Sequence, residues 1–395
     1  MYRNSKDSPS KNEDVKIVIQ SSFTIAQSRS NSFMDDFRFI FMLFYLVGID
    51  VQETEDCASI RRSSRVCKKT SIRSIVRCCL TNFIFVIFTL KILVKAYVTI
   101  GEEIRSKFPI IIIGILKVSL YISVYRKRRQ ILKTMENLSQ ELKMFPKYNL
   151  KKEKYSFIAF FTFTTLFGVV WYAMDFHFGF GRKKNQDYLV AVLLRKPFIS
   201  CFIVINDFLF HFVGINVLSS FIVFYMLVCI LSRIIFQHIR DNLGLVRVLE
   251  DFQKLVTLHE HTLNILESFD KNFSFSFFIT ILLTMIGIFR CGYSVTFIED
   301  NPTLLNAYLI SSMFLYMFFQ LLLMISGSIT NEAAKDTSDV LKKRYKKDFK
   351  SPKLEVDFSQ NSLTIWKIYI LDRSLIVASF GTLLTFGILL GTLGK

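Results

Sequence analysis

The sequence predicts an all-α integral membrane protein with seven transmembrane helices, a cytosolic amino terminus and an extracellular carboxyl terminus. Three observations support this prediction. Hydrophobic residues make up 51% of the 395 residues, and the mean hydropathy is positive, which does not fit a water-facing surface of this size. Only 6 Pro and 15 Gly interrupt the chain, against 42 Phe, which favours long helices. Several apolar runs also reach the roughly 20 residues that a membrane helix needs.

Residues 1–77 are expected to form a cytosolic tail. The first 32 residues are rich in Ser, Asn, Lys and Asp and show little apolar periodicity, which is typical of disordered segments. Phe37–Gly48 is apolar but only about 12 residues long, and no positively charged leader with a cleavage site precedes it. We therefore expect an interfacial helix over residues 37–48, lying at the inner membrane surface, rather than a signal peptide or a span.

Apolar stretches of the required length recur along the rest of the chain. The second is short, and the fourth is long enough to continue past the membrane into water. Residues 78–231 hold the first four spans, residues 273–326 the fifth and sixth, and residues 370–395 the seventh. The predicted spans are Cys78–Ile100, Phe108–Tyr125, Tyr155–Phe176, Phe198–Leu231, Phe273–Tyr293, Leu304–Ser326 and Ile370–Leu393.

Two segments between spans are expected to form a cytosolic helical layer. Within residues 232–272, apolar residues recur at helical spacing, which predicts that the fourth span continues as a helix with one packed face. These residues are Leu243, Val246, Leu249, Phe252, Leu255, Leu258, Leu263 and Leu266. Residues 327–369 combine a helical first part, a basic run and a break at Ser351 and Pro352, which predicts an anchor segment that leads into the last span.

The orientation follows from the distribution of basic residues. Of the 50 Lys and Arg, 37 fall in the segments on one side of the predicted membrane and 8 in those on the other. The positive-inside rule places the richer side, and with it the amino terminus, in the cytosol. The net charge of +18 therefore indicates a lipid bilayer as partner and no nucleic acid. We interpret two basic runs as topology signals and lipid headgroup contacts, namely Arg126–Arg129 and Lys342–Lys347.

The last span carries a stripe of small and hydroxylated residues on one face. At 100° per residue the stripe contains Ser374, Ala378, Gly381, Thr382, Thr385, Ile388, Leu389 and Thr392. Several such helices around an axis would line a narrow water-filled pore with Thr385 and Thr392. Ile388 and Leu389 would close this pore, because an apolar constriction excludes water. Alternatively, the hydroxyls bond their own helix and the small residues allow close packing. Asp372 and Arg373 are expected to anchor the start of this helix.

Ionisable and aromatic residues in the outer halves of three spans form a candidate ligand pocket. Ionisable groups inside a membrane are costly, and aromatic walls with a few polar groups suit a small organic ligand. The alternatives are an ion pair that holds helices together and an interfacial aromatic belt. The candidates are Trp171, Tyr172, Asp175, Asp207, Phe208, His211, Phe212, Arg290 and Tyr293.

Signatures of catalysis and of metal binding are missing from the sequence. His259-Glu260-His261 differs from a zinc-binding HExxH motif, because the second His would have to stand where the chain has Leu263. There is no Walker loop, G-x-S-x-G or Rossmann fingerprint. We expect neither an enzyme nor a cofactor. Cys201 and Cys291 both lie toward the outer ends of their spans, as a bridged pair or as two buried thiols.

The carboxyl-terminal segment Ile370–Leu393 resembles the last helix of arthropod gustatory receptors. Those helices begin with LDRSLL and end in Thr-Tyr, five hydrophobic residues and Gln-Phe. Here Leu371 to Leu375 match the start and Thr385 matches the Thr, whereas Phe386 replaces Tyr, and Thr392 and Leu393 stand where Gln and Phe occur. Residues 255–282, with His261, Leu263 and the triplet Asn272-Phe273-Ser274, also resemble the segment that enters the fifth span of those receptors.

The resemblance implies a ligand-gated, non-selective cation channel in the plasma membrane. It implies assembly as a homo- or hetero-tetramer with related receptors, with the last helices around a central pore. It also implies a pocket for a small organic tastant in the outer half of each bundle and a cytosolic layer that anchors the tetramer. Two other functions stay open, namely a G-protein-coupled receptor and a secondary transporter. The charge distribution and the lack of D-R-Y and N-P-x-x-Y motifs oppose the former, and Asp207, His211 and Arg290 suit the latter.

Overall fold

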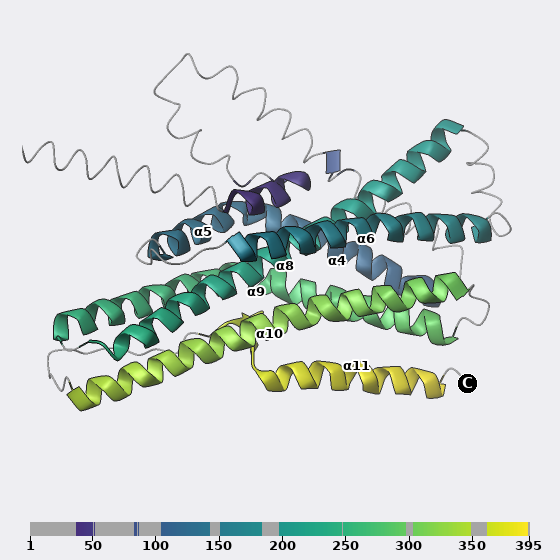
Figure 1. The fold of residues 1–395 in the computed structure, drawn as a ribbon. Coiled ribbons are helices and arrows are strands. Elements are labelled where there is room, and N and C mark those ends of the chain that lie inside the picture. The colour runs from purple at the N-terminus through teal and green to yellow at the C-terminus, as the bar shows by residue number, and fades with distance from the viewer. Residues whose placement is uncertain are drawn as a thin grey trace, which may run out of the picture.

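The computed structural model describes residues 37–49, 51, 83, 84, 86, 104–142, 151–183, 197–246, 248–297, 303–348 and 362–393. The described chain is a bundle of helices with one short β-hairpin (Figure 1). Its elements, after a short helix Phe37–Leu46, are α4 (Ile104–Arg126), α5 (Arg128–Leu142), α6 (Lys151–Lys183), α8 (Pro197–Leu243), α9 (Leu249–Phe297), α10 (Thr303–Asp348), β1 (Thr364–Ile365), β2 (Tyr369–Ile370) and α11 (Arg373–Leu393).

The helices overlap the predicted spans. Within the described residues, four are long and apolar enough to cross a membrane, and they overlap predicted spans three to six: Lys154–Met174, Phe208–Leu243, Leu249–Thr296 and Thr303–Asp348. α4 covers the second predicted span, and α11 occupies most of the seventh. The first predicted span, Cys78–Ile100, lies almost wholly outside the described residues, so the count of seven stays a prediction.

Three long helices run the length of the bundle, as Figure 1 shows for α8, α9 and α10. α8 and α9 are joined by a turn at Gly244 and Leu245, where the Leu245 amide donates to the Asn242 carbonyl at 2.9 Å. Of the eight apolar residues that predicted a packed face over residues 232–272, six are buried, Leu255 is half-buried and Leu249 is exposed. The extension is therefore two helical pieces that pack by their apolar faces.

Aromatic rings fill the core where α8 and α9 cross. Phe224 lies 5.3 Å from Phe273 and 5.7 Å from Phe269, measured between ring centroids, and all three side chains are almost fully buried. The short helix Phe37–Leu46 adds to this core, because Phe44 lies edge-on to Phe224 at 6.1 Å. The predicted interfacial helix thus packs its apolar face on the bundle, while its location at the inner membrane surface stays a prediction.

A β-hairpin connects to α11. β1 and β2 pair antiparallel through a turn in which Trp366 and Lys367 adopt φ values of 48° and 58°. The left-handed region is unfavourable for residues with a Cβ, and the Trp366 ring offsets the strain by packing 4.9 Å from Phe278 and 5.7 Å from Phe275. Strands of two residues leave too little alternation for a sequence pattern to detect, so the prediction for residues 327–369 contains no strand.

A candidate ligand cavity and the junction with the last helix

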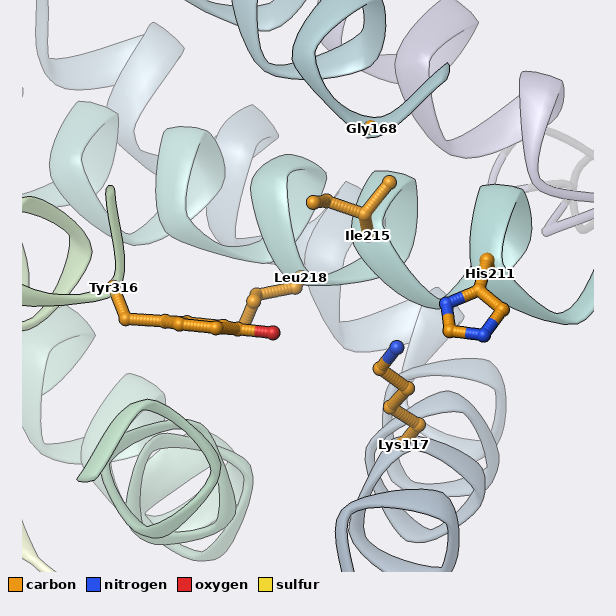
Figure 2. A pocket seen from close by; sticks show the side chains of 6 residues that line it. All are labelled: Lys117, Gly168, His211, Ile215, Leu218 and Tyr316. Atoms are coloured by element: carbon orange, nitrogen blue, oxygen red, sulfur yellow. The ribbon is translucent and has the colours of Figure 1, made fainter. Parts of the chain in front are cut away.

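Side chains from four helices line a small, partly open cavity (Figure 2). Its volume is about 10 Å³, which is room for about one water molecule. Its lining residues come from α4, α6, α8 and α10 and are Lys117, Gly168, His211, Ile215, Leu218 and Tyr316. A polar or charged group from three of the helices reaches the same small space.

The cavity residues meet at one depth because the helices run alongside one another. Lys117 lies 13 residues after the start of α4, Tyr316 lies 13 residues after the start of α10, and His211 lies 14 residues after the start of α8. At 1.5 Å per residue, each is about 20 Å from the same end of the bundle. If these helices span a membrane as predicted, the cavity lies within it.

Lys117 is the charged residue of the cavity. Its side chain is only 9% exposed, and its aliphatic stem lies against Gly214, where an added Cβ would approach Lys117 Cδ to 2.8 Å. The ammonium lies 5.5 Å from the centroid of the Phe210 ring. Our sequence analysis did not single out Lys117, although a charge in the middle of the predicted span Phe108–Tyr125 was a signal that could have identified it.

Glycines let two walls of the cavity approach neighbouring helices closely. A Cβ at Gly168 of α6 would lie 2.8 Å from Ile215 Cγ2, and a Cβ at Gly287 of α9 would lie 2.7 Å from the Tyr316 ring. Contacts this short require glycine. Ile215 therefore packs directly on the backbone of α6 at Gly168, and Tyr316 packs on that of α9 at Gly287; we call these two contacts the glycine notches.

The structure brings four of the predicted pocket residues together. Tyr172 lies 5.1 Å from Phe208 and 6.0 Å from His211, between ring centroids, and Phe208 lies 5.7 Å from Phe212. His211 lines the cavity, and the other three form an aromatic cluster beside it on α6 and α8.

Two of the remaining predicted pocket residues lie on α9. Arg290 is half-buried on α9 and lies within electrostatic range of Tyr316, while Tyr293 is 46% exposed. The side chains of Trp171, Asp175 and Asp207 lie outside the described part of the structure. Cys291 is a free, buried thiol, which matches the alternative of buried thiols rather than a bridge to Cys201.

A hydrogen-bonded junction holds the hairpin against α10. The Asn331 side chain donates to the carbonyls of Leu363 at 3.0 Å and Leu371 at 2.9 Å, and accepts from the Leu363 amide at 2.7 Å. Leu371 is 1% exposed and packs on Gly327, where a Cβ would lie 2.8 Å from Leu371 Cδ1. One side chain of α10 thereby fixes both ends of the hairpin.

The same junction ties the hairpin to α9. Asp270 accepts from the Thr364 amide at 2.7 Å and from the Thr364 hydroxyl at 2.8 Å. Burial raises the pKa of the Asp270 carboxyl above its ordinary value, and these two hydrogen bonds oppose that rise because they favour the charged form. Sequence reasoning missed Asp270 and Asn331, because neither belongs to a local motif.

Asp372 and Arg373 lie where the junction meets α11. Asp372 caps the helix, since its carboxylate accepts from the Leu375 amide at 2.9 Å and from the Ser374 hydroxyl at 2.8 Å. Arg373 binds Glu332 of α10 through two hydrogen bonds of 2.7 Å each. The first residues of α11 are thus bonded both within the helix and to α10.

Many of the described side chains of α11 are exposed within this chain. The exposed residues include Ser374, Ala378, Gly381, Thr382 and Thr385 of the predicted stripe, and Val377 and Leu384 are 73% and 67% exposed. The Thr382 and Thr385 hydroxyls donate to the carbonyls of Ala378 and Gly381, as the packing alternative expects. The side chains of Ile388, Leu389 and Thr392 lie outside the described part of the structure.

The fold is similar to that of a solved receptor. The insect olfactory receptor OR5 from Machilis hrabei, solved in complex with eugenol, matches with a TM-score of 0.53 and 13% identity over 91% of this chain and 99% of that one. At this identity the likeness shows a shared fold. No protein-family model and no curated protein matches the sequence. Among the described residues, no group of three or more His, Cys, Asp or Glu is arranged to hold a metal ion.

Proposed function

We propose that this chain is a chemoreceptor of the gustatory type, a ligand-gated non-selective cation channel that detects small organic tastants. The single observation that carries the proposal is the fold, which it shares with an insect olfactory receptor solved with a small aromatic molecule, eugenol. The resemblance of Ile370–Leu393 to the last helix of gustatory receptors supports the finer assignment. Enzymatic activity and a cofactor have no part in this proposal.

The proposed ligand site is the cavity at Lys117 and His211 together with the adjacent cluster of Tyr172, Phe208 and Phe212. Aromatic walls with a few polar groups are typical of sites for small organic molecules. The cavity has room for about one water molecule, so a tastant must displace side chains to enter. Trp171, Asp175, Asp207, Arg290 and Tyr293 remain candidates for its outer part.

The proposed pore is formed by α11 from four copies of the chain or of related receptors. Small and hydroxylated residues along one face of a membrane helix favour contact with other helices over contact with lipid, and Gly381, Thr382 and Thr385 are exposed within this chain. In a tetramer, the stripe that contains Thr385 and Thr392 would face the axis, with Ile388 and Leu389 as the gate. The hairpin junction, including Asp372 and Arg373, would transmit movement from α9 and α10 to this helix.

In the proposed topology the helix ends near α5 are cytosolic, the amino terminus is inside and the carboxyl terminus is outside, across the plasma membrane.

A secondary transporter is the second candidate. Lys117 and His211 favour it, because ionisable residues inside the membrane often mark the pathway of a transported ion or proton.

The gate assignment is tested with Ile388→Ala and Leu389→Ala. Smaller side chains widen an apolar constriction and admit water, so both variants should carry a basal cation current several times that of the wild type, measured in whole-cell recordings. The matched control is Leu383→Ala, because Leu383 lies nine residues after Ser374 and hence on the opposite face of the helix. Unchanged basal currents in both gate variants, with normal surface expression, would remove Ile388 and Leu389 from the pore.

A further inference from the structure

The last helix packs on α9 and α10 through one of its faces, and Figure 1 shows it beside α10. Its half-buried side chains recur at i, i+1, i+4 and i+5, which places them on one side of the helix. They are Leu375, Ile376, Ser379 and Phe380. Among the side chains of α11 that the structure describes, Ser379 is the polar member of this face. A polar group in an otherwise apolar helix contact favours the one register in which it finds a partner.

Gln320 of α10 provides that partner. Its amide donates to the Ser379 hydroxyl oxygen at 3.3 Å, and the Ser379 hydroxyl donates in turn to the Ile376 carbonyl at 2.9 Å. The Met324 sulfur lies beside both groups, 3.9 Å from the Gln320 amide nitrogen and 3.7 Å from the Ser379 oxygen. Gln320 is fully buried and lies within a predicted span, where an amide without partners is costly. The position of α11 that supplies the hydroxyl is therefore favoured.

This hydrogen bond lies deeper in the bundle than the ion pair between the same two helices. Arg373 and Glu332 form that pair at the first turn of α11, where both side chains are exposed to solvent. Ser379 lies six residues later, about 9 Å further along the helix axis. A hydrogen bond in apolar surroundings is electrostatically stronger than one in contact with water. Gln320 thus holds α11 at a depth that solvent does not screen.

The bond also fixes the rotation of α11 about its own axis. Ile388 lies nine residues after Ser379, and at 100° per residue the two positions are on opposite sides of the helix. The rotation that places Ser379 on Gln320 therefore directs the position of Ile388 away from α10, toward the axis of the proposed pore. A donor–acceptor distance of 3.3 Å is already long for a hydrogen bond, so a helix that turns loses the bond.

We propose that Gln320 is a positioning residue of the gate, which holds α11 in its closed rotation through the hydrogen bond with Ser379. The cavity of the proposed ligand site has room for about one water molecule, so the bond belongs to the arrangement without a tastant. Loss of the bond frees α11 to turn, which moves Ile388 off the pore axis and admits water. The inference rests on the proposed function, since it concerns the gate of that channel. It adds a residue outside α11 that sets the gate.

The test removes the bond from either side and also keeps it. Gln320→Met retains the length of the side chain without the amide, Ser379→Ala removes the hydroxyl, and Ser379→Thr retains it. Ser311→Ala is the matched control, because Ser311 is exposed on α10 and its hydroxyl donates to its own helix at Ala307. The readout is the basal cation current of whole cells, divided by the amount of chain at the cell surface, which corrects for changes in folding and export.

Gln320→Met and Ser379→Ala should each raise this ratio by about 10-fold, because a buried group is left without its partner. The double variant should exceed neither single variant by more than about 2-fold, since all three lack the same bond. Ser379→Thr and Ser311→Ala should keep the wild-type ratio. If Gln320→Met does not reach the surface, Ser379→Ala decides. Unchanged ratios in the single variants, an additive double variant, or an equal rise in Ser379→Thr would each overturn the inference.

A second measurement reports the rotation without any current. Nitroxide labels carried by unnatural amino acids at Leu384 of α11 and Ile205 of α8, both exposed, give a distance in the purified full-length chain, diluted with unlabelled chain. A side chain lies about 5 Å from the axis of its helix, so a turn of about 60° moves the label on α11 by about 5 Å. Gln320→Met should shift or broaden the distance distribution by about that amount, and Ser311→Ala should not.

The two measurements separate this inference from the proposed function. If the label moves in Gln320→Met and the wild type gives no current with mixed tastants, the positioning role of Gln320 stands and the channel is contradicted. If the wild type gives a current, and Gln320→Met changes neither the label distance nor the basal ratio, the channel stands and the inference is overturned.

Discussion

The cavity and the hairpin junction are built in opposite ways. At the junction, Asn331 and Asp270 make five hydrogen bonds to the hairpin, and none is longer than 3.0 Å. At the cavity, Gly168 and Gly287 let Ile215 and Tyr316 approach the facing helices closely, and the Lys117 ammonium lies 5.5 Å from the centroid of the Phe210 ring. Directional bonds fix one relative position of two elements, whereas van der Waals contacts allow neighbouring positions of similar energy.

This difference matches the separate tasks that we propose for the two regions. A site that admits a ligand larger than its resting volume has to change shape, and van der Waals contacts such as those at Gly168 and Gly287 permit small shifts. A connection between the bundle and α11 has to move as one piece, and three bonded contacts, at Asn331, Asp270 and Glu332, provide that. The comparison yields four predictions, given from the largest expected effect on stability to the smallest.

Asn331→Leu should be the most damaging change. It removes three hydrogen bonds and leaves two carbonyls and one amide of the hairpin without their partner, at a cost of roughly 3 kcal/mol or more. The measurement is the thermal unfolding of the purified chain, with surface expression as a second readout. The matched control is Asn264→Leu, because Asn264 is exposed on α9. Equal stability of the two variants would show that the junction is not a fixed connection.

His259 tests whether the predicted cytosolic layer is as tightly packed as the junction. It is 3% exposed, and burial, helped by the charge of Lys342, lowers its pKa from 6.5 to about 4. The folded state therefore binds this proton less readily than the unfolded chain does. The contribution is fully present above about pH 6.5 and is lost as the pH falls toward 4, on the order of 3 kcal/mol in all.

The measurement is Tm as a function of pH between 7.5 and 4.5, for the wild type and for His259→Leu. The variant should lose the largest part of the acid sensitivity in this range. His238→Leu is the control, since burial also lowers the pKa of His238 but its side chain is only half-buried. If both variants keep the full acid sensitivity of the wild type, His259 is accessible to water and the layer is looser than we describe.

Gly168→Ala tests the close contact between α6 and Ile215 of α8 in the cavity wall. The added Cβ would lie 2.8 Å from Ile215 Cγ2, so α6 or Ile215 must shift, at about 1 to 3 kcal/mol. Gly244→Ala is the control, because no atom lies within 4 Å of its added Cβ. We expect a lower Tm and a weaker ligand response for Gly168→Ala alone. A fully neutral result would mean that α6 and α8 are not held in this register.

The smallest effect on stability is expected for the pair of Arg373 and Glu332. It is exposed to solvent and screened, so Arg373→Glu should barely change Tm. Its role should appear in gating, as a change of a few-fold in the ligand concentration for half-maximal current. The double variant Arg373→Glu with Glu332→Arg should restore the wild-type value. The corresponding single change Arg240→Glu, in the 4.0 Å pair with Asp336, should leave that concentration unchanged.

The long helices were predictable from the sequence, and their contacts were not. Runs of apolar residues identified α4, α6, α8, α9, α10 and α11 because helix length and membrane thickness constrain one another. The packed face from Leu243 to Leu266 was predictable because apolar residues recur there at helical spacing, although the structure divides it between the end of α8 and the start of α9. The hairpin was not, because its strands are too short to show a pattern.

The site was predicted in part. His211 and the rings of Tyr172, Phe208 and Phe212 were identified because unusual residues stood out in an apolar span. Lys117 could have been identified by the same rule. The partners Asn331 with Leu371, and Asp270 with Thr364, are separated by 40 and 94 residues, and pairing over that distance depends on tertiary structure. The contacts at the glycine notches were not predictable either, because a glycine in a helix does not indicate which side chain it faces.

The most direct test of the proposed function is a current recording from the purified full-length chain in a planar bilayer, with no G protein or nucleotide present. Epitope tags at the two ends report orientation, and the ligands are small organic tastants, applied first as mixtures. We predict that a ligand that raises Tm also evokes a cation current within its binding range, in channels with the amino terminus on one side and the carboxyl terminus on the other. A ligand that raises Tm and evokes no current in correctly oriented protein would contradict the account.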